Sequence, residues 1–308
     1  MRVGVIGLGT MGAPVARNVA RAGFDLVVHD IKTEAGQEFI DQGAAWADSP
    51  ASLIDAVDVV ITMVFGPKQI DEVARGPGGL LSGECRERVW IDLTTTRPSL
   101  SRELGSLFEE RGGYLVDAPV TGSVDAAIRG DMPMFVGGSD AAVERCKTVL
   151  DAIGEIRRVG RHGNGAAAKL VNNQLWKIQA AAIGEAMVAA KKAGIAPEIW
   201  WESMKGGAAD SFVMHHDVPS IFAGHYDPSF PLALVLKDLD LIEEFLQEHG
   251  VDAPITRAMH QQFREARDAY GDDAGEMTVC RLIEDRAGVS LRVPGDWQAP
   301  WDVDPKAA

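Results

Sequence analysis

The first half of the chain alternates short apolar, β-branched runs with longer segments in which apolar residues recur at helical spacing. Strands are expected at residues 3–6, 26–29, 57–63, 89–93 and 114–117, with helices between them near 11–22, 34–42, 67–74 and 98–111. Strands that are apolar on both faces and alternate with helices predict a mostly parallel sheet covered on both sides, the doubly wound α/β architecture. A further run at 132–136 is expected to add an outer strand.

The pattern changes after about residue 160. Residues 164–193 are rich in Ala, Leu, Ile, Lys and Gln and contain no proline, which predicts one long helix that ends before Gly194. Further helices are expected near 197–205, 232–249, 254–270 and 275–287. We therefore predict an α/β domain at 1–162, an all-helical domain at 163–292 and a C-terminal arm at 293–308. Trp297 and Trp301 favour an arm that packs on a neighbouring surface, and the sequence leaves open which surface.

Composition fits a folded protein of about two domains, because 308 residues with 46% hydrophobic and 24% charged residues match ordinary globular usage. Thirty Lys and Arg against forty-five Asp and Glu leave a formal charge of −15. This surplus repels a phosphate backbone, so no nucleic-acid partner is expected. An acidic protein that handles a small anion has to place its few cations locally, which makes the positions of individual lysines informative.

Cysteine usage and hydropathy point to a soluble cytoplasmic protein. Three cysteines form an odd set without CxxC spacing, which argues against a disulfide framework or a zinc site, and no metal is expected. The first expected strand begins too close to Met1 for a secretion signal. The most apolar long stretch, 178–190, is interrupted by Gln179 and Glu185 and is too short to span a membrane.

A glycine-rich segment follows the first expected strand and opens a helix. It has the spacing G-x-G-x-x-G and consists of Gly7, Leu8, Gly9, Thr10, Met11 and Gly12. In this context the glycines permit a tight turn, close approach of a pyrophosphate and close packing of helix on strand. Asp30, 18 residues after Gly12, is placed to bind an adenosine ribose and to repel a 2′-phosphate, which favours NAD, whereas nearby Lys32 favours NADP. The alternative is a glycine-rich turn with Asp30 as a surface cap.

Two further strand ends offer cofactor contacts at the edge of the sheet where ligands of such folds bind. Met63 and Val64 close the strand at 57–63, and Thr95 follows the strand at 89–93. The threonines could instead begin the next helix, with Thr96 as its cap, and for Thr95 a cap and a cofactor contact are equally favoured.

Candidate substrate contacts begin at Thr121, Gly122 and Ser123, which end the strand at 114–117. A hydroxyl beside a glycine offers a side-chain oxygen and an unobstructed backbone N–H, which suits a carboxylate. Taken alone, this segment is better explained as a simple turn.

Lys169 and Asn173 lie four residues apart on the long helix and so share one face. The neighbours of Lys169 are mostly alanine, leucine and valine, and desolvation makes an ammonium easier to deprotonate, as proton transfer requires. From spacing alone, a solvated surface lysine remains the better explanation. Lys237 lies on another expected helix, where the alternative is an i, i+3 charge pair.

Taken together, these segments resemble the β-hydroxyacid dehydrogenase family, which includes 3-hydroxyisobutyrate dehydrogenase and tartronate semialdehyde reductase. The resemblance runs from residue 1 to about 288 and involves four motifs in the family's order. It implies a Rossmann domain that binds NAD, with NADP possible, and a helical domain like the C-terminal domain of 6-phosphogluconate dehydrogenase. It also implies a homodimer or homotetramer in which the long helix contributes to dimerisation.

The resemblance also implies an activity and a set of roles. The reaction would be hydride transfer between the nicotinamide and a short 3-hydroxy acid, interconverting the acid with its aldehyde or oxo acid. The roles carried over are Gly7, Gly9 and Gly12 for the diphosphate, Thr121 and Gly122 for the substrate carboxylate, Lys169 as general acid and base, Asn173 as its substrate-orienting partner, and Lys237 near the nicotinamide.

Several departures from the family pattern leave the substrate open. The usual Ser-Gly-Gly is Thr121-Gly122-Ser123 here, and Trp176, seven residues after Lys169, is large for a position beside a substrate. The alternatives are an imine reductase and a non-catalytic dinucleotide-binding scaffold. Lys169 disfavours both, because proteins of those kinds lack or replace the lysine.

Overall fold

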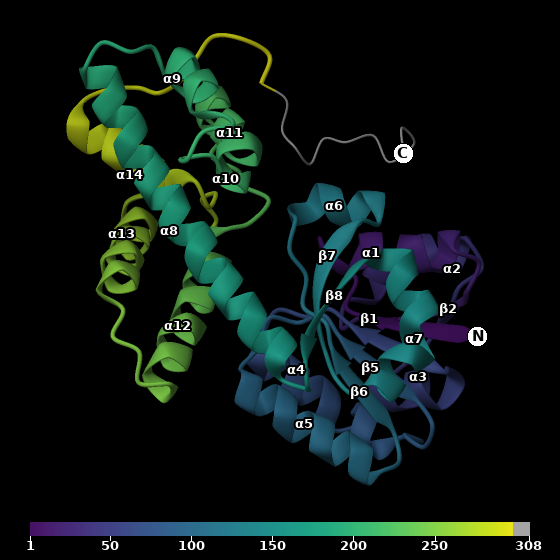
Figure 1. Cartoon of the computed structure of the whole chain (residues 1–308). Coiled ribbons are helices and arrows are strands. Elements are labelled where there is room, and N and C mark those ends of the chain that lie inside the picture. The colour runs from purple at the N-terminus through teal and green to yellow at the C-terminus, as the bar shows by residue number, and fades with distance from the viewer. Residues whose placement is uncertain (298–308) are drawn as a thin grey trace. The chain divides into compact units, whose positions relative to one another are not determined.

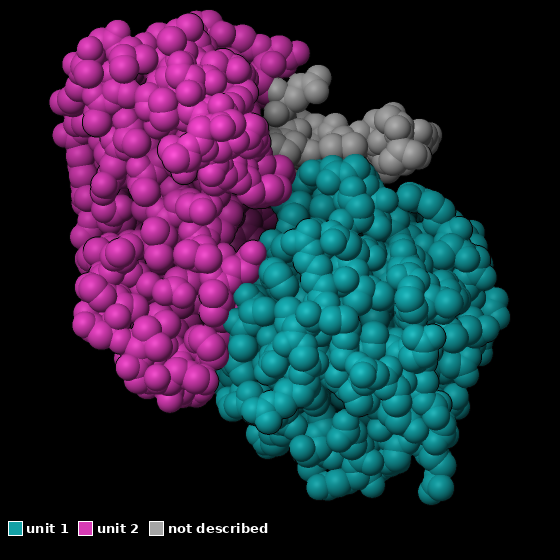
Figure 2. All heavy atoms as spheres, viewed as in Figure 1, with its two compact units in different colours: residues 1–169, 304–308 teal, residues 170–303 magenta. Residues whose placement is uncertain are grey.

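The structure is a computed structural model, and it describes residues 1–297. Within these residues the chain divides into two compact units (Figure 2), with unit 1 at residues 1–169 and unit 2 at residues 170–297. The long helix α8 (Asn164–Lys192) begins in unit 1 and continues in unit 2.

Unit 1 is built on an eight-stranded sheet of order β3-β2-β1-β4-β5-β6-β7-β8 (Figure 1). Its strands are β1 (Arg2–Ile6), β2 (Asp25–His29), β3 (Ala45–Trp46), β4 (Val59–Thr62), β5 (Val89–Asp92), β6 (Tyr114–Asp117), β7 (Met132–Gly137) and β8 (Gly154–Gly160). The first six are parallel, β7 is antiparallel to β6, and β8 is parallel to β7. The chain leaves β1 toward β2 and later returns to β4 on the other side, so the strand order reverses between β1 and β4.

Helices cover both faces of this sheet because its strands are apolar on both sides. The helices of unit 1 are α1 (Gly12–Arg21), α2 (Gln37–Asp41), α3 (Pro50–Ala56), α4 (Pro67–Arg75), α5 (Pro98–Glu110), α6 (Ser123–Arg129) and α7 (Asp140–Ile153). Val3 and Val5 pack in one core with residues of α1, α6 and α7. Val60 and Trp90 pack in a second core with residues of α3, α4 and α5. The doubly wound α/β class is confirmed.

In the described residues of unit 2 the regular elements are all helices, and one isolated bridge pairs Pro231 with Gly275. After α8 come α9 (Pro197–Met204), α10 (Phe212–His216), α11 (Val218–Ala223), α12 (Leu232–Glu248), α13 (Pro254–Tyr270) and α14 (Thr278–Ala287). A Cβ added at Gly184 would lie 2.8 Å from the sulfur of Cys280, so glycine lets α14 pack directly on α8. Within the described residues, no helix is long and apolar enough to cross a membrane.

The sequence pattern missed short elements and one edge of the sheet. β3, α3, α6, α7, α10 and α11 were not expected. The strand expected at the outside is β7, but β8 lies beyond it. β8 has the sequence GEIRRVG, and its charged residues are typical of an exposed edge strand rather than of a buried one.

The start of the C-terminal arm packs on unit 2 itself. The ring of Trp297 lies 4.9 Å from that of Phe222 in α11 and 5.8 Å from that of Trp201 in α9, measured between centroids. The indole N–H of Trp297 donates to the carbonyl of Val293 at 3.0 Å. Trp301 lies outside the described residues.

We therefore expect Trp297→Ala to lower the free energy of unfolding by about 2 kcal/mol, roughly half the cost of removing a fully buried tryptophan. Urea denaturation of the variant and the wild type measures this difference. Ile255→Ala, which truncates a side chain in a residue that is 66% exposed, serves as the control. An unchanged midpoint for Trp297→Ala would show that the arm adds nothing to the stability of unit 2.

Candidate active site

The glycine-rich loop between β1 and α1 uses its three glycines in three different ways. Gly7 has a φ of +92°, and a Cβ there would lie 2.2 Å from the carbonyl oxygen of Met63. A Cβ at Gly12 would lie 1.9 Å from the carbonyl oxygen of Gly7. At Gly9 an added Cβ would meet nothing within 4 Å. Gly7 and Gly12 thus keep the loop tight, while Gly9 leaves its outer face open at the N-terminus of a helix, where a diphosphate fits.

Asp30 joins the end of β2 to this loop. Its carboxylate accepts hydrogen bonds from the backbone N–H of Leu8 at 2.7 Å and from that of Lys32 at 2.8 Å. The carboxylate therefore lies beside the loop, as the dinucleotide fingerprint requires of its ribose-binding acid.

The ends of β4 and β5 continue the same edge of the sheet. Met63 and Val64 follow β4, and the N–H of Val64 donates to the hydroxyl of Thr94 at 3.3 Å. Neither Thr95 nor Thr96 caps α5, because the N-cap residue is Arg97 and its side chain makes no capping bond. The alternative in which Thr96 caps the next helix is therefore wrong. For Thr95 this removes one of its two interpretations, and the cofactor contact remains a prediction.

Two buried aspartates lie side by side beneath this edge. Asp92 ends β5 and is directly opposite Asp117 at the end of β6. Asp92 accepts bonds from the hydroxyl of Thr62 at 2.8 Å and from the N–H of Thr94 at 3.0 Å. Burial raises the pKa of each carboxyl to about 6, although the hydrogen bonds favour the charged forms and act to lower it.

This shift predicts a pH dependence of stability. Between about pH 4 and pH 6 the folded protein holds a proton on Asp92 that the unfolded chain has lost, so this carboxyl stabilises the fold at low pH, and its contribution is lost as the pH rises through 6. The unfolding free energy of the wild type relative to Asp92→Asn should therefore fall by up to about 3 kcal/mol from pH 4 to pH 7. Denaturant unfolding at both pH values measures it, with Asp25→Asn on the exposed start of β2 as the control. If the unfolding free energies of the wild type and Asp92→Asn changed in parallel with pH, the raised pKa of Asp92 would be contradicted.

Asp117 fixes the beginning of α8. Its two carboxylate oxygens accept bonds from the N–H groups of Gly163 at 3.0 Å and Ala166 at 2.9 Å. A Cβ at Gly165 would lie 2.3 Å from the carbonyl oxygen of Phe135, so only glycine allows the helix to start this close to the sheet. Lys169 follows within the second turn of α8, and unit 1 therefore carries it at the edge of the sheet where β6 ends.

The segment Thr121–Ser123 leads from β6 into α6 at this edge. The backbone N–H of Thr121 donates to the carbonyl of Pro133 at 2.9 Å. Gly122 and Ser123 both have left-handed backbone angles, with φ of 100° and 70°. The serine thus occupies a conformation that favours glycine, at the position where the family pattern has a glycine. It is the first residue of α6, a helix that the sequence did not predict.

In unit 2, Asp238 connects two of the predicted site residues. The amide nitrogen of Asn173 donates to one of its carboxylate oxygens at 2.7 Å, and the ammonium of Lys237 lies 3.0 Å from the other. Asn173 and Asp238 are buried. Lys237 thus forms an ion pair with its direct neighbour in the sequence. Asp238 was not predicted as a site residue, although its position beside Lys237 was a usable signal.

Trp176 and Lys177 of α8 face a buried, acidic part of unit 2. The indole N–H of Trp176 donates to Asp217 at 2.9 Å, and Lys177 is completely buried. Asp217, Asp227 and His216 each present a possible metal-ligand atom, and these atoms lie within 4.8 Å of one another. Because Asp217 already pairs with His216 and with Trp176, we assign no metal here.

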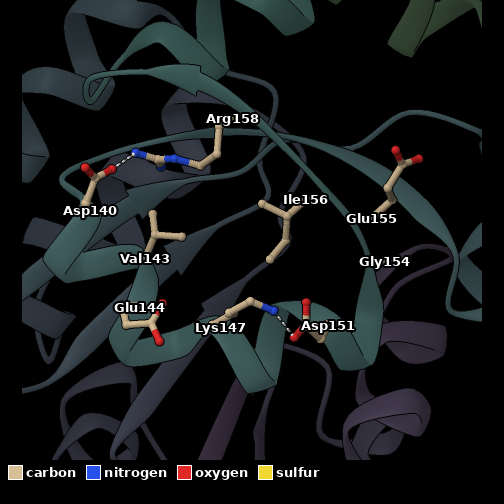
Figure 3. A pocket seen from close by; sticks show the side chains of 9 residues that line it. All are labelled: Asp140, Val143, Glu144, Lys147, Asp151, Gly154, Glu155, Ile156 and Arg158. Atoms are coloured by element: carbon tan, nitrogen blue, oxygen red, sulfur yellow. Dashed lines mark hydrogen bonds and ion pairs between the residues drawn. The ribbon is translucent and has the colours of Figure 1, made fainter.

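A separate open pocket lies on unit 1 between α7 and β8 (Figure 3). Charged residues dominate its lining. One ion pair, Arg158–Asp140 at 2.9 Å, joins β8 to α7, and another, Lys147–Asp151 at 2.5 Å, lies along α7. None of the site residues predicted from the sequence lines it.

Comparison with known proteins agrees with this geometry. Residues 2–163 match the model of the NAD-binding domain of 6-phosphogluconate dehydrogenase. Residues 163–283 match the model of the NAD-binding domain of NADP-dependent 3-hydroxyisobutyrate dehydrogenase.

Individual relatives cover nearly the whole chain. L-threonate dehydrogenase of Cupriavidus necator is 33% identical over 283 residues, which cover 91% of this chain and 95% of the relative. Human mitochondrial 3-hydroxyisobutyrate dehydrogenase is 32% identical over 270 residues, covering 85% and 80%. The solved structure of Mycobacterium tuberculosis 3-hydroxyisobutyrate dehydrogenase with L-serine has a TM-score of 0.84 at 27% identity, covering 92% and 99%.

The dinucleotide loop, the fold and these relatives define an NAD(P)-dependent oxidoreductase that acts on the CH–OH group of hydroxy acids. The chain belongs to the β-hydroxyacid dehydrogenase family, as its sequence motifs predicted.

Proposed function

We propose that the protein interconverts a short 3-hydroxy acid with its aldehyde or oxo acid, and that Lys169 is the general acid and base. The observation that carries this proposal is the anchoring of α8 by Asp117, which holds Lys169 at the same sheet edge as the dinucleotide loop. The relatives support the substrate class, since relatives at 31–33% identity include enzymes named for L-threonate, 2-(hydroxymethyl)glutarate and 3-hydroxyisobutyrate.

Lys169 moves one proton in each direction. As an ammonium it donates a proton to the carbonyl oxygen during reduction, and as a neutral amine it removes the proton of the alcohol during oxidation. General acid–base assistance of this kind contributes about 10²–10⁴ in rate, or roughly 3–5 kcal/mol of barrier.

Neighbouring groups orient the substrate. The amide of Asn173 carries two hydrogens, of which Asp238 accepts one, and we assign the second to the reacting oxygen. Thr121, through its hydroxyl, and Gly122 and Ser123, through their backbone N–H groups, are assigned to the substrate carboxylate. Lys237 is assigned to the nicotinamide end and to the substrate, and Trp176 to the border of the substrate site.

The cofactor supplies the hydride chemistry when bound. The residues assigned to it are Gly7, Leu8, Gly9, Thr10, Met11 and Gly12 for the diphosphate, Asp30 for the adenosine ribose, and Met63, Val64 and Thr95 along the next strand ends. Because a carboxylate at Asp30 repels a 2′-phosphate, we propose NAD rather than NADP as the preferred cofactor.

We further propose a cytoplasmic homodimer or homotetramer in which α8 contributes to the interface between subunits. Val171 and Leu175 support this, because these apolar residues of α8 lie four apart and are 41% and 56% exposed. Light scattering on the purified protein distinguishes these assemblies from a monomer.

Product analysis tests the proposed reaction. The enzyme is incubated with NAD⁺ or NADP⁺ and each of 3-hydroxyisobutyrate, glycerate, 3-hydroxypropionate, serine and threonate, and carbonyl products are trapped with a hydrazine and identified by mass spectrometry. We expect a 3-oxo product from at least one acid and a faster reaction with NAD⁺. Cyclic imines with the reduced cofactors form the parallel arm, and turnover of imines alone would identify an imine reductase instead.

A further inference from the structure

We propose that Lys177 is a positioning residue, which holds Asp238 and through it the amide of Asn173 and the ammonium of Lys237. This inference rests on the proposed function, because it assigns a purpose to the geometry of two residues of that site. Lys177 is not one of the site residues predicted from the sequence motifs.

The first observation is the burial of Lys177. Its exposed fraction is 0%, and its ammonium nitrogen lies 3.7 Å from a carboxylate oxygen of Asp238. The same nitrogen lies 5.0 Å from the ring centroid of Trp176 and 5.7 Å from that of Phe230. It has no hydrogen-bond partner among the described atoms. A solvated surface lysine has none of these properties, so Lys177 needs an explanation inside unit 2.

The second observation is that Asp238 is shared. One carboxylate oxygen accepts the bond from Asn173 at 2.7 Å and also faces Lys177, while the other pairs with Lys237 at 3.0 Å. Asp238 is only 1% exposed, so little water is available to stabilise its charge. A carboxylate that is buried in this way stays ionised only where cations and hydrogen-bond donors surround it.

The third observation is the charge around Lys177. It is faced by Asp238 and Lys237 on α12 and by Glu276, which precedes α14. Burial lowers the pKa of Lys177, while Asp238 and Glu276 oppose that effect. Burial and the nearby Asp217 and Asp227 raise the pKa of Glu276, which favours its neutral form and leaves Asp238 as the carboxylate that Lys177 balances.

The spacing along α8 fits this arrangement. Lys169, Asn173 and Lys177 follow one another at intervals of four residues, so they occupy one face of the helix. The proposed catalytic lysine comes first, its substrate-orienting partner one turn later, and the buried lysine one turn further on. Lys177 thus acts through Asp238 and contacts neither substrate nor cofactor.

A double-mutant cycle between Lys177 and Asp238 tests the proposal in the full-length enzyme. Lys177→Met, Asp238→Asn and the combined variant are compared for kcat, for KM of the hydroxy acid and for the dissociation constant of NAD⁺. Lys192→Met, at the exposed end of the same helix, is the matched control, and Lys177→Arg tests rescue by a retained charge.

We expect Lys177→Met to lower kcat at least about tenfold, with NAD⁺ affinity changed less than about twofold. The combined variant should be no slower than Asp238→Asn alone, because Lys177 acts only through that carboxylate. Lys177→Arg should recover part of the loss. A Lys177→Met enzyme with the kcat of the wild type, or losses that multiply in the combined variant, would overturn the proposal.

A readout without substrate separates this inference from the proposed reaction. In protein labelled with ¹⁵N at asparagine, the side-chain amide hydrogens of Asn173 should exchange slowly with water in the wild type and at least about tenfold faster in Lys177→Met. Equal exchange rates would overturn the positioning role. If the wild type oxidises no hydroxy acid, the proposed function fails, and the exchange measurement alone decides the role of Lys177.

Discussion

An enzyme with alanine in place of Lys169 is expected to turn over its hydroxy acid about 10²–10⁴ times more slowly than the wild type while binding NAD⁺ with unchanged affinity. The loss follows because water has to replace the side chain to which we assign the proton exchange with the reacting oxygen. Cofactor affinity should be retained because the proposed diphosphate and ribose contacts belong to the loop after β1 and to Asp30. Steady-state kinetics with the preferred acid and a fluorescence titration of the cofactor measure the two quantities.

The control is Lys192→Ala, which removes a lysine from the last turn of the same helix, where the side chain is exposed. This variant should keep the turnover of the wild type. A Lys169→Ala enzyme that binds NAD⁺ and retains near-normal turnover would remove Lys169 from the proton transfer.

The second large effect is expected from alanine substitutions at two glycines of the dinucleotide loop. One should lower both stability and NAD⁺ affinity, and the other should lower NAD⁺ affinity alone. Gly12→Ala places a methyl group 1.9 Å from a backbone oxygen of Gly7, so the loop has to move. We expect a loss of about 1–3 kcal/mol of stability together with at least a tenfold loss of NAD⁺ affinity. Gly9→Ala meets nothing within 4 Å, so its stability should stay within about 0.5 kcal/mol of the wild type.

The Gly9→Ala methyl group nevertheless stands where we propose that the diphosphate approaches the backbone, and we expect NAD⁺ to bind about 10–100 times more weakly. Urea denaturation and calorimetric titration of both variants separate stability from affinity. A Gly9→Ala protein that binds NAD⁺ as tightly as the wild type would contradict the placement of the diphosphate over this residue.

The fold was predictable where the local sequence preference and the tertiary environment favour the same structure. The parallel strands are buried on both faces and therefore read as continuous apolar runs, and the dinucleotide loop needs glycine for reasons that act within a few residues. The edge strand β8 and the helices α6 and α7 were missed. Charged residues in β8 obscure the strand pattern. The segment Thr121–Ser123 at the start of α6 was interpreted as a turn, and Ser123 indeed has the left-handed backbone of a turn residue.

The site was predictable only in part, because burial is a property of the folded unit. The residues of the family motifs could be identified as candidates. However, the apolar surroundings that were expected to desolvate the ammonium of Lys169 are found in the structure around Lys177. Helical spacing places both lysines on one face of α8 and does not show which is enclosed. The carboxylate of Asp238 likewise gains its importance from partners on another helix, Asn173 and Lys177, which are far from it in the sequence.

The most direct test of the proposed reaction follows the hydride itself. The hydroxy acid preferred in the substrate panel is prepared with deuterium on its carbinol carbon and incubated with the wild-type enzyme and NAD⁺. Mass spectrometry of the reduced cofactor should then show one deuterium transferred per turnover, and Lys169→Ala should slow that transfer by about 10²–10⁴. Reduced cofactor without deuterium would contradict the proposed hydride transfer. Transfer at the wild-type rate in Lys169→Ala would contradict the proposed role of Lys169.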